Sequence, residues 1–296
     1  MSISSPPPHL PPIFSSKKIN NKKLNDDTSL TRPTDLAIAA TTANKHWWDS
    51  DANDYHHRHS AYLSSFYWCP EMLHEKDAGL LGSIDNQKIL EVGCGSAPCS
   101  HWLASRYPDA QVTAFDISAQ MLRRYGETSD TKSTHSPPNL HLLQANALAL
   151  PFAEKSFDIV FSAFGAFPFL PDLTAAFTEV AAVIKPGGLF VYSIGHPMRW
   201  IFDDDPASMQ VRYSYFDKDY EEHDEYGQLS YAEYQHQFSE HIRALSATGF
   251  SLYDVHEPAW PADLTQTWGQ WSPLRGAHFP GTAIFSARYK SLQTGT

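Results

Sequence analysis

The stretch that decides the fold is residues 88–96, Lys-Ile-Leu-Glu-Val-Gly-Cys-Gly-Ser. It predicts an apolar strand at 88–92 that ends at Gly93 and Gly95, before a helix expected at 97–107. Glycine lets the backbone turn sharply and approach a ligand closely, and the following helix N-terminus favours negative charge. Two glycines alone also fit an ordinary strand-to-helix turn or a dinucleotide site. The dinucleotide pattern needs a third glycine where this chain has Pro98, a good helix starter, which argues against NAD.

An acidic residue follows at the position where a nucleotide cofactor would need one. Asp116 ends the next expected strand, 21 residues beyond Gly95. A carboxylate at the end of that strand can accept hydrogen bonds from both hydroxyls of a ribose. The spacing therefore favours a nucleoside-containing ligand over a plain structural turn.

Strands and helices alternate along the rest of the chain. The expected strands are 111–116, 140–144, 157–162, 189–194, 250–255 and 282–289, and the expected helices are 118–125, 173–183 and 232–247. Such alternation predicts a mostly parallel sheet with helices on both faces. The helix at 232–247 is expected to end at Thr248-Gly249.

Composition excludes several classes of protein. The chain has 296 residues, 42% of them apolar and 19% charged, with a net charge of -11. These values predict a soluble, cytoplasmic protein with one large core and disfavour partners such as nucleic acids and anionic membranes. No apolar stretch is long enough to span a membrane, and three cysteines make neither a disulfide framework nor a four-cysteine zinc site.

The two segments outside the alternation have distinct compositions. Residues 1–34 are rich in proline, lysine and small polar residues, which predicts a disordered N-terminal extension, with a transit peptide as the alternative. Residues 35–82 are aromatic and predict a helical cap, with helices at 36–48, 54–68 and 71–82.

An acidic and aromatic insert is expected at about 197–232, after the fifth strand. Between Asp203 and Glu225 it holds nine acidic residues and two basic ones. Its tyrosines suggest a hairpin or lid, whereas a solvated acidic loop explains the charge equally well.

Five motifs in order and at suitable spacing carry a family resemblance. They are the 89–96 stretch, Asp116, the pair Asn146-Ala147, the run 151–160, and Ile-Lys-Pro-Gly-Gly at 184–188. With them the sequence resembles the class I S-adenosylmethionine-dependent methyltransferases. The resemblance implies an α/β, Rossmann-like, doubly wound sheet of seven strands in the order 3-2-1-4-5-7-6, with strand 7 antiparallel, in a cofactor-binding domain at 83–296.

The resemblance also implies roles for individual residues. Glu91, Gly93, Cys94 and Gly95 would hold the methionine part of the cofactor, and Asp116 its ribose. Those beside the adenine would be Ile117, Met121, Asn146 and Ala147, while Ser162, Ala163 and Phe164 would face the methyl group. Asn146 stands where aspartate is commoner, but an amide oxygen still accepts from an amino group. Ala97 stands where the fuller Gly-x-Gly-x-Gly form of this family's motif has its third glycine, and this is a frequent variation.

The N-terminal motif Trp47-Trp48-Asp49, followed by Tyr55-His56, resembles more narrowly the cap of actinobacterial-like small-molecule methyltransferases. This subgroup implies a reaction type and leaves the substrate open. We expect Trp47 or Tyr55 to close over the methionine end of the cofactor, and the acidic insert to form the outer wall of the acceptor site.

Methyl transfer from a sulfonium is an in-line displacement, and a general base is needed only when the nucleophile arrives protonated. Candidate bases are His196, Tyr55 and His236, with a hydrogen-bonded structural histidine as the alternative for each imidazole. A metal site is not expected, because His56, His57 and His59 do not share one helix face.

Aromatic residues make up 13% of the chain and concentrate in the segments able to cover the pocket. They favour a small apolar or aromatic acceptor, although a cap also needs such residues for its own core. The predicted function is methyl transfer from S-adenosylmethionine to a small molecule, giving S-adenosylhomocysteine. A catalytically silent binding protein and an NAD(P)-dependent oxidoreductase are the alternatives, and the oligomeric state is left open.

Overall fold

The computed structural model describes residues 33–125 and 136–290. The extension predicted at 1–34 lies outside the described residues, except for the last two, which begin the first helix. Part of the loop predicted between the second helix and third strand of the alternation also lies outside them.

A seven-stranded sheet forms the centre of the fold, in the order β3-β2-β1-β4-β5-β9-β8. The five strands β3, β2, β1, β4 and β5 pair in parallel, and β9 is antiparallel to both of its neighbours, β5 and β8. The sheet order and the antiparallel strand predicted from the family resemblance are confirmed. The strands are β1 (Lys88–Val92), β2 (Gln111–Asp116), β3 (Leu140–Gln144), β4 (Phe157–Ala163), β5 (Ile184–Gly195), β8 (Phe250–His256) and β9 (Thr282–Tyr289).

Strand β5 begins five residues earlier than expected. Ile184 pairs with Phe157, after which the register shifts, and regular pairing resumes where Leu189 meets Ile159. The Lys-Pro-Gly-Gly turn therefore lies inside the strand as an irregularity and does not precede it.

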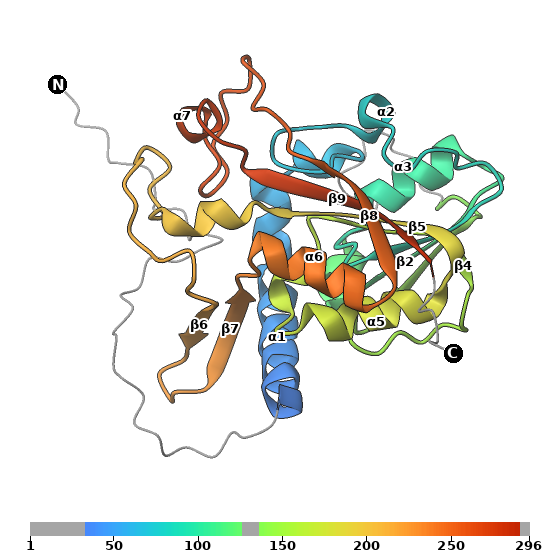
Figure 1. The fold of residues 1–296 in the computed structure, drawn as a ribbon, viewed down its shortest axis with the longest axis horizontal. Helices are drawn as coiled ribbons and strands as arrows, with labels where there is room; N and C mark the ends of the chain where they lie inside the picture. The colour runs from blue at the N-terminus through green and yellow to red at the C-terminus, as the bar shows by residue number, and fades with distance from the viewer. Residues whose placement is uncertain (1–32, 126–135, 291–296) are drawn as a thin grey trace.

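Helices cover both faces of the sheet (Figure 1). Neighbouring residues of a strand point to opposite faces, so Leu90 joins one apolar cluster with Phe177 and Leu245, while Ile89 joins another with Leu103. The first cluster packs under α5 (Leu173–Val183) and α6 (Phe238–Ala247), and the second under α3 (Pro98–Arg106) and the segment before β1. A further short helix, α4 (Ala119–Arg123), follows β2.

The N-terminal segment differs from the three predicted helices. Helix α1 (Pro33–Arg58) is continuous, because residues 49–53 contain no proline or glycine to end it. A 3-10 turn, η1 (Tyr62–Ser64), and the short helix α2 (Glu75–Ala78) follow. The helix predicted at 71–82 is reduced to α2 because Met72 takes a φ of 59° and the chain reverses there.

Helix α1 joins the insert to the sheet. Asp49 of α1 accepts hydrogen bonds from the Ser118 hydroxyl (2.7 Å) and the Gln120 amide (3.1 Å) at the start of α4. On another side α1 runs alongside the hairpin of β6 (Asp219–His223) and β7 (Leu229–Tyr234), as Figure 1 shows. The insert thus contains a hairpin, one of the forms that its sequence suggested.

Helix α6 begins later than predicted because residues 232–234 belong to β7. Gln237 and Glu240 form a reciprocal capping box that starts the helix at Phe238. The three remaining short elements are η2 (Phe167–Phe169), η3 (Pro197–Ile201) and α7 (Pro273–Gly276).

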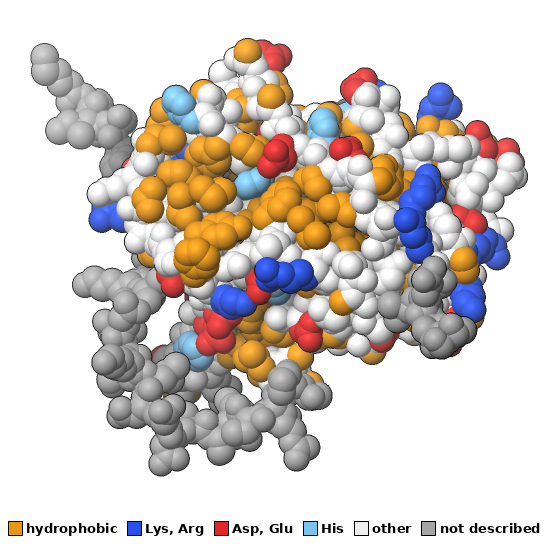
Figure 2. Space-filling view, in the orientation of Figure 1, with side chains coloured by type: hydrophobic (Ala, Val, Ile, Leu, Met, Phe, Trp, Pro, Cys, Tyr) orange, Lys and Arg blue, Asp and Glu red, His pale blue; other side chains and the backbone are white. Residues whose placement is uncertain are grey.

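The surface around the insert is chemically mixed. Figure 2 shows apolar side chains gathered over η3 and the neighbouring C-terminal part of the chain. Met198, Val211 and Leu274 are among the exposed apolar residues of these segments.

Within the described ranges, no helix combines the length and apolar character that crossing a bilayer requires.

Candidate active site

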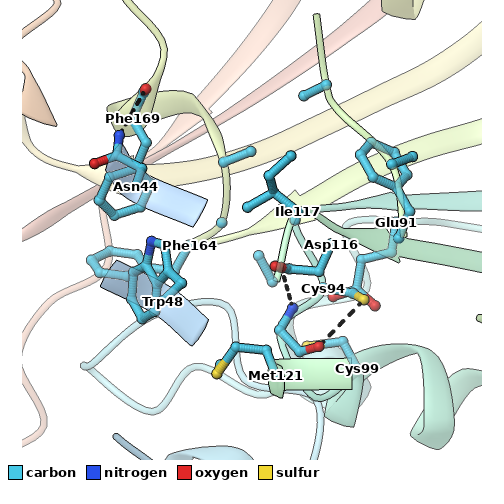
Figure 3. Close-up of a pocket in the computed structure, with 18 of the residues that line it drawn as sticks. Asn44, Trp48, Glu91, Cys94, Cys99, Asp116, Ile117, Met121, Phe164 and Phe169 are labelled. Atoms are coloured by element: carbon cyan, nitrogen blue, oxygen red, sulfur yellow. Dashed lines mark hydrogen bonds between the residues drawn. The ribbon is translucent and has the colours of Figure 1, made fainter. Parts of the chain in front are cut away.

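A pocket of about 970 Å³, including its open mouth, lies at the carboxyl ends of β1, β2 and β4. Open α/β sheets place their ligands at this edge of the sheet. Figure 3 shows two sides of it: Glu91, Cys94, Asp116 and Met121 lie on one, and an aromatic group on the other. We call these the polar half and the aromatic half.

The glycine turn shapes the polar half. Gly93 and Gly95 have φ values of 69° and 57°, which side chains other than glycine rarely adopt. A Cβ at Gly93 would lie 2.6 Å from the Ala166 backbone nitrogen, and one at Gly95 would lie 3.1 Å from the Met121 methyl carbon. Glycine is therefore required here both by the turn and by close packing against pocket-lining residues.

Asp116 holds the turn in place. One carboxylate oxygen accepts the Gly95 amide hydrogen at 2.8 Å, and the other accepts that of Ser118 at 2.8 Å. Burial raises the pKa of Asp116 to about 6, although these two bonds oppose the shift. Each oxygen keeps a further lone pair, so the carboxylate can still accept from hydroxyl groups of a ligand in the pocket.

Glu91 lies beneath the turn and is almost fully buried, with 1% of its surface exposed. It accepts hydrogen bonds from the backbone amide and the hydroxyl of Ser100 at the start of α3. Burial raises its pKa to about 8 in spite of these donors. The side chain is therefore largely protonated at neutral pH.

The far end of the polar half suits a flat heterocycle. Ile117 and Met121 supply apolar surface, and Asn146 and Ala147 also line the pocket. The Asn146 side-chain oxygen accepts the Leu148 amide hydrogen at 2.9 Å, which fixes the direction of its carboxamide.

Of the cofactor-binding residues predicted from sequence, all except Ser162 line this pocket: Tyr55, Glu91, Gly93, Cys94, Gly95, Asp116, Ile117, Met121, Asn146, Ala147 and Ala163. The structure contradicts the prediction for Ser162. Its hydroxyl points to the other face of β4 and donates to the Val92 carbonyl at 2.7 Å, with none of the residue exposed.

The two candidate histidines also lie away from the pocket. His196 hydrogen-bonds to Glu257 (2.9 Å), accepts the Met198 amide hydrogen and caps η3. Burial lowers its pKa, while Glu257 opposes the shift. His236 bonds to the Leu170 carbonyl (2.8 Å) and borders a separate, smaller cavity. The predictions that His196 and His236 line the pocket are wrong, because each imidazole forms a structural hydrogen bond elsewhere.

Tyr55, the third candidate base, does line the pocket. Burial raises the pKa of its phenol well above the usual value, so the group remains protonated at neutral pH. It is placed to donate a hydrogen bond and is poorly suited to remove a proton.

Aromatic rings form the other half of the pocket. Trp48 meets Tyr55 and Phe169 edge-on, with ring centroids 5.4 Å apart in each pair. Phe164 lines the same side, and Figure 3 shows it with Trp48 across the pocket from Glu91. Trp48 and Phe169 were not predicted as site residues, although the aromatic richness of both segments was the available signal.

Asn44 is a further residue that the sequence did not indicate. It lines the pocket from α1 and is 4% exposed. Its side chain bonds to Ala232 of β7 and to the Phe169 carbonyl of η2. No sequence signal distinguishes this asparagine from an exposed one on the same helix.

Of the two aromatic residues expected over the pocket, Tyr55 lines it and Trp47 does not, and the acidic insert does not form its outer wall. Trp47 does not line the pocket: its ring packs on Tyr231 of β7, with centroids 5.0 Å apart. The hairpin contacts Asn44 and Trp47. Of the acidic residues of β6, Asp219 and Glu221 are exposed and Glu222 is half-buried. The described acidic residues of the insert therefore form no wall of the pocket.

Metal ligands were not expected, and no cluster of three or more suitable side chains occurs within the part of the chain that the structure describes. The pocket itself is built from a glycine turn, a carboxylate and aromatic rings.

Comparisons with known proteins agree with this geometry. Residues 89–188 match the family described as "Methyltransferase domain". The chain is 30% identical over 114 residues to the fatty-acid O-methyltransferase of Mycolicibacterium smegmatis, covering 38% of this chain and 39% of that protein. It is 37% identical over 101 residues to the demethylmenaquinone methyltransferase of Listeria welshimeri, covering 34% and 41%. The chain thus spans about two fifths of the length of these relatives.

Solved structures share the fold. A putative S-adenosylmethionine-dependent methyltransferase from Listeria monocytogenes superimposes with a TM-score of 0.58 at 18% identity, covering 72% of this chain and 95% of that one. A methyltransferase from Mesorhizobium loti gives 0.51 at 19% identity, covering 71% and 94%. Residues 89–188 thus match the methyltransferase-domain family, and the sheet around them has the fold of these solved methyltransferase structures.

Proposed function

We propose that this protein transfers a methyl group from S-adenosylmethionine to a small, largely apolar acceptor. The observation that carries the proposal is one pocket in which a polar half with a glycine turn and a carboxylate opens directly into an aromatic half. A methyltransferase needs this adjacency, because nucleophile and methyl carbon must meet in line with the sulfur.

The residues of the polar half fit S-adenosylmethionine. We assign the ribose hydroxyls to Asp116, whose remaining lone pairs are available, and the adenine to the apolar surface of Ile117 and Met121. Gly93 and Gly95 leave space for the methionine part beside Glu91. A protonated Glu91 would donate a hydrogen bond to a ligand oxygen there.

The aromatic half supports an apolar acceptor. Trp48, Tyr55, Phe164 and Phe169 offer ring faces and edges, which pack on flat or aliphatic groups and exclude water. The names of two relatives point in the same direction, since a fatty acid and demethylmenaquinone both combine an apolar body with a polar reacting end.

When bound, the cofactor supplies a methyl group already activated on a positively charged sulfur. The protein has to align the acceptor and keep water out, which in favourable cases lowers a barrier by about 7–11 kcal/mol. The protonated phenol of Tyr55 can orient an acceptor oxygen by donating a hydrogen bond. Acceptors that reach the pocket already ionised suit this arrangement, because Tyr55 remains a donor.

Two measurements on the purified full chain test the proposal. Calorimetry should detect binding of S-adenosylhomocysteine, and Asp116→Asn should weaken it. Formation of S-adenosylhomocysteine from S-adenosylmethionine should then occur with some members of a panel of medium-chain fatty acids, naphthols and alkylamines. A wild-type protein that binds neither form of the cofactor would contradict the assignment. Cofactor binding without turnover of any compound in an extended panel would favour a silent binding protein.

A further inference from the structure

Phe164 has an unusual backbone conformation for a large residue. Its φ is 56°, in the left-handed region that side chains other than glycine, asparagine and aspartate seldom adopt. Such conformations persist only where the surrounding structure imposes them, and they concentrate at ligand sites. Phe164 directly follows β4 and lines the aromatic half of the pocket.

Ser193 of β5 imposes this conformation. Its hydroxyl accepts the Phe164 amide hydrogen at 2.8 Å and donates to the Trp68 carbonyl at 2.6 Å. Ser193 is fully buried and pairs with Ala163 in the sheet. A single hydroxyl therefore connects the pocket loop, the central sheet and the segment that precedes α2.

The next residue prevents the loop from relaxing. A Cβ at Gly165 would lie 2.6 Å from the Gly93 carbonyl oxygen and 2.7 Å from the Ser162 hydroxyl. The backbone that follows Phe164 is thus pressed against the glycine turn of the polar half. Because both flanks are fixed, the backbone sets the direction in which the Phe164 Cα–Cβ bond leaves the loop.

That direction brings the ring to the aromatic half. Behind it stand Trp271 and Trp268, with ring centroids 5.3 Å and 6.0 Å from that of Phe164. The other side of Phe164 faces the pocket (Figure 3). Two tryptophans prevent the ring from retreating, so its size limits what fits beside the reacting end of the cofactor.

We infer that Phe164 is a specificity-determining residue whose ring sets the size of the acceptor site, and that Ser193 is the positioning residue that aims it. The inference rests on the proposed function for the identity of the acceptor. It makes a separate claim about binding, because an apolar molecule in the aromatic half should respond to both residues even without turnover.

The test uses N-phenyl-1-naphthylamine, a neutral apolar fluorescent dye, bound to the full chain in the presence of saturating S-adenosylhomocysteine. Phe164→Ala should weaken dye binding roughly tenfold, because ring packing is lost. Ser193→Ala should weaken dye binding roughly threefold, because the Phe164 amide loses the hydroxyl that fixes the position of the ring. The affinity for S-adenosylhomocysteine should stay within about threefold of wild type in both variants.

A double-mutant cycle separates positioning from a general structural effect. If Ser193 acts through the ring, Phe164→Ala combined with Ser193→Ala should bind the dye as Phe164→Ala alone does. Ser193→Thr keeps the hydroxyl and should retain wild-type dye affinity, which covers the case in which Ser193→Ala fails to fold. Unchanged dye binding in Phe164→Ala, or fully additive losses in the double variant, would overturn the inference.

Failure of the proposed function gives a different result. A wild-type protein that does not bind S-adenosylhomocysteine contradicts the cofactor assignment, and the dye series is then measured on the protein alone. The comparison of Phe164 and Ser193 variants still decides the inference about the aromatic half.

Discussion

Asn44 and Ala232 form a reciprocal pair of hydrogen bonds across 188 residues of sequence. The Asn44 side-chain oxygen accepts the Ala232 amide hydrogen at 2.9 Å, and its amide group donates to the Ala232 carbonyl at 2.9 Å. The side chain thus replaces a strand partner for β7. It also donates to the Phe169 carbonyl at 3.4 Å, which ties the hairpin, α1 and η2 together beside the aromatic half.

Replacing Asn44 by alanine should destabilise the protein by about 2–4 kcal/mol, because two buried backbone groups of Ala232 lose their partner. Denaturant unfolding of the full chain measures the loss. Asn53→Ala on the exposed side of the same helix is the matched control and should stay within about 0.5 kcal/mol of wild type. Equal effects of the two substitutions would show that the hydrogen bonds between Asn44 and Ala232 contribute nothing to stability.

Asp116→Ala should weaken S-adenosylhomocysteine binding by about 2–4 kcal/mol, because two ribose hydroxyls lose a charged acceptor and the Gly95 amide loses its partner. Calorimetry gives the affinity, and thermal unfolding checks that the variant is folded. The exposed Asp109→Ala serves as a charge-matched control with unchanged affinity expected. A folded Asp116 variant with wild-type affinity would remove this residue from the cofactor site.

Glu91 should make stability fall as pH rises. Its folded pKa, about 8, is above the ordinary value of 4.5, so the folded state holds a proton that the unfolded state releases in between. The free energy of unfolding should therefore decrease from about pH 4.5 to pH 8, by an amount on the order of a few kcal/mol. Glu91→Gln should reduce this slope in urea unfolding curves. The same slope in the variant would assign it to other buried acids, such as Glu233.

Gly93→Ala tests the close packing of the turn. The new Cβ would lie 2.6 Å from the Ala166 nitrogen, whereas a Cβ at Gly187 would have nothing within 4 Å. Both glycines have positive φ, 69° and 80°, so Gly187→Ala carries the backbone strain alone and should cost about 1 kcal/mol. Gly93→Ala should cost at least about 2 kcal/mol more, and should also weaken S-adenosylhomocysteine binding. Equal costs in unfolding experiments would contradict the packing argument.

The strands and the residues at their carboxyl ends could be predicted because their signals are local, whereas the strand order came from the family resemblance. The alternation of apolar runs and helices defines the strands, and the Gly93-Cys94-Gly95 turn and Asp116 are each read at a strand end. Their neighbours in the pocket follow from the sheet edge that all parallel strands share.

The errors arise where long-range contacts decide. Ser162 and Ala163 are adjacent, but only Ala163 lines the pocket because consecutive strand residues face opposite sides. His196 follows the carboxyl end of β5, as expected, but its imidazole hydrogen-bonds to Glu257, which lies 61 residues later in the chain. Asn44 gave no signal, because its partners on β7 and η2 become neighbours only in the folded chain.

The wall of the aromatic half has a consequence for engineering. Asn44 lines the pocket from the first described helix and is held by a hairpin that follows the fifth strand, so this wall depends on a distant segment that does not itself line the pocket. A chimaera that imports only the hairpin of another protein would change the support of Asn44 without changing the helix that carries it. Grafts intended to change which compounds enter must exchange α1 and the hairpin together, as one module.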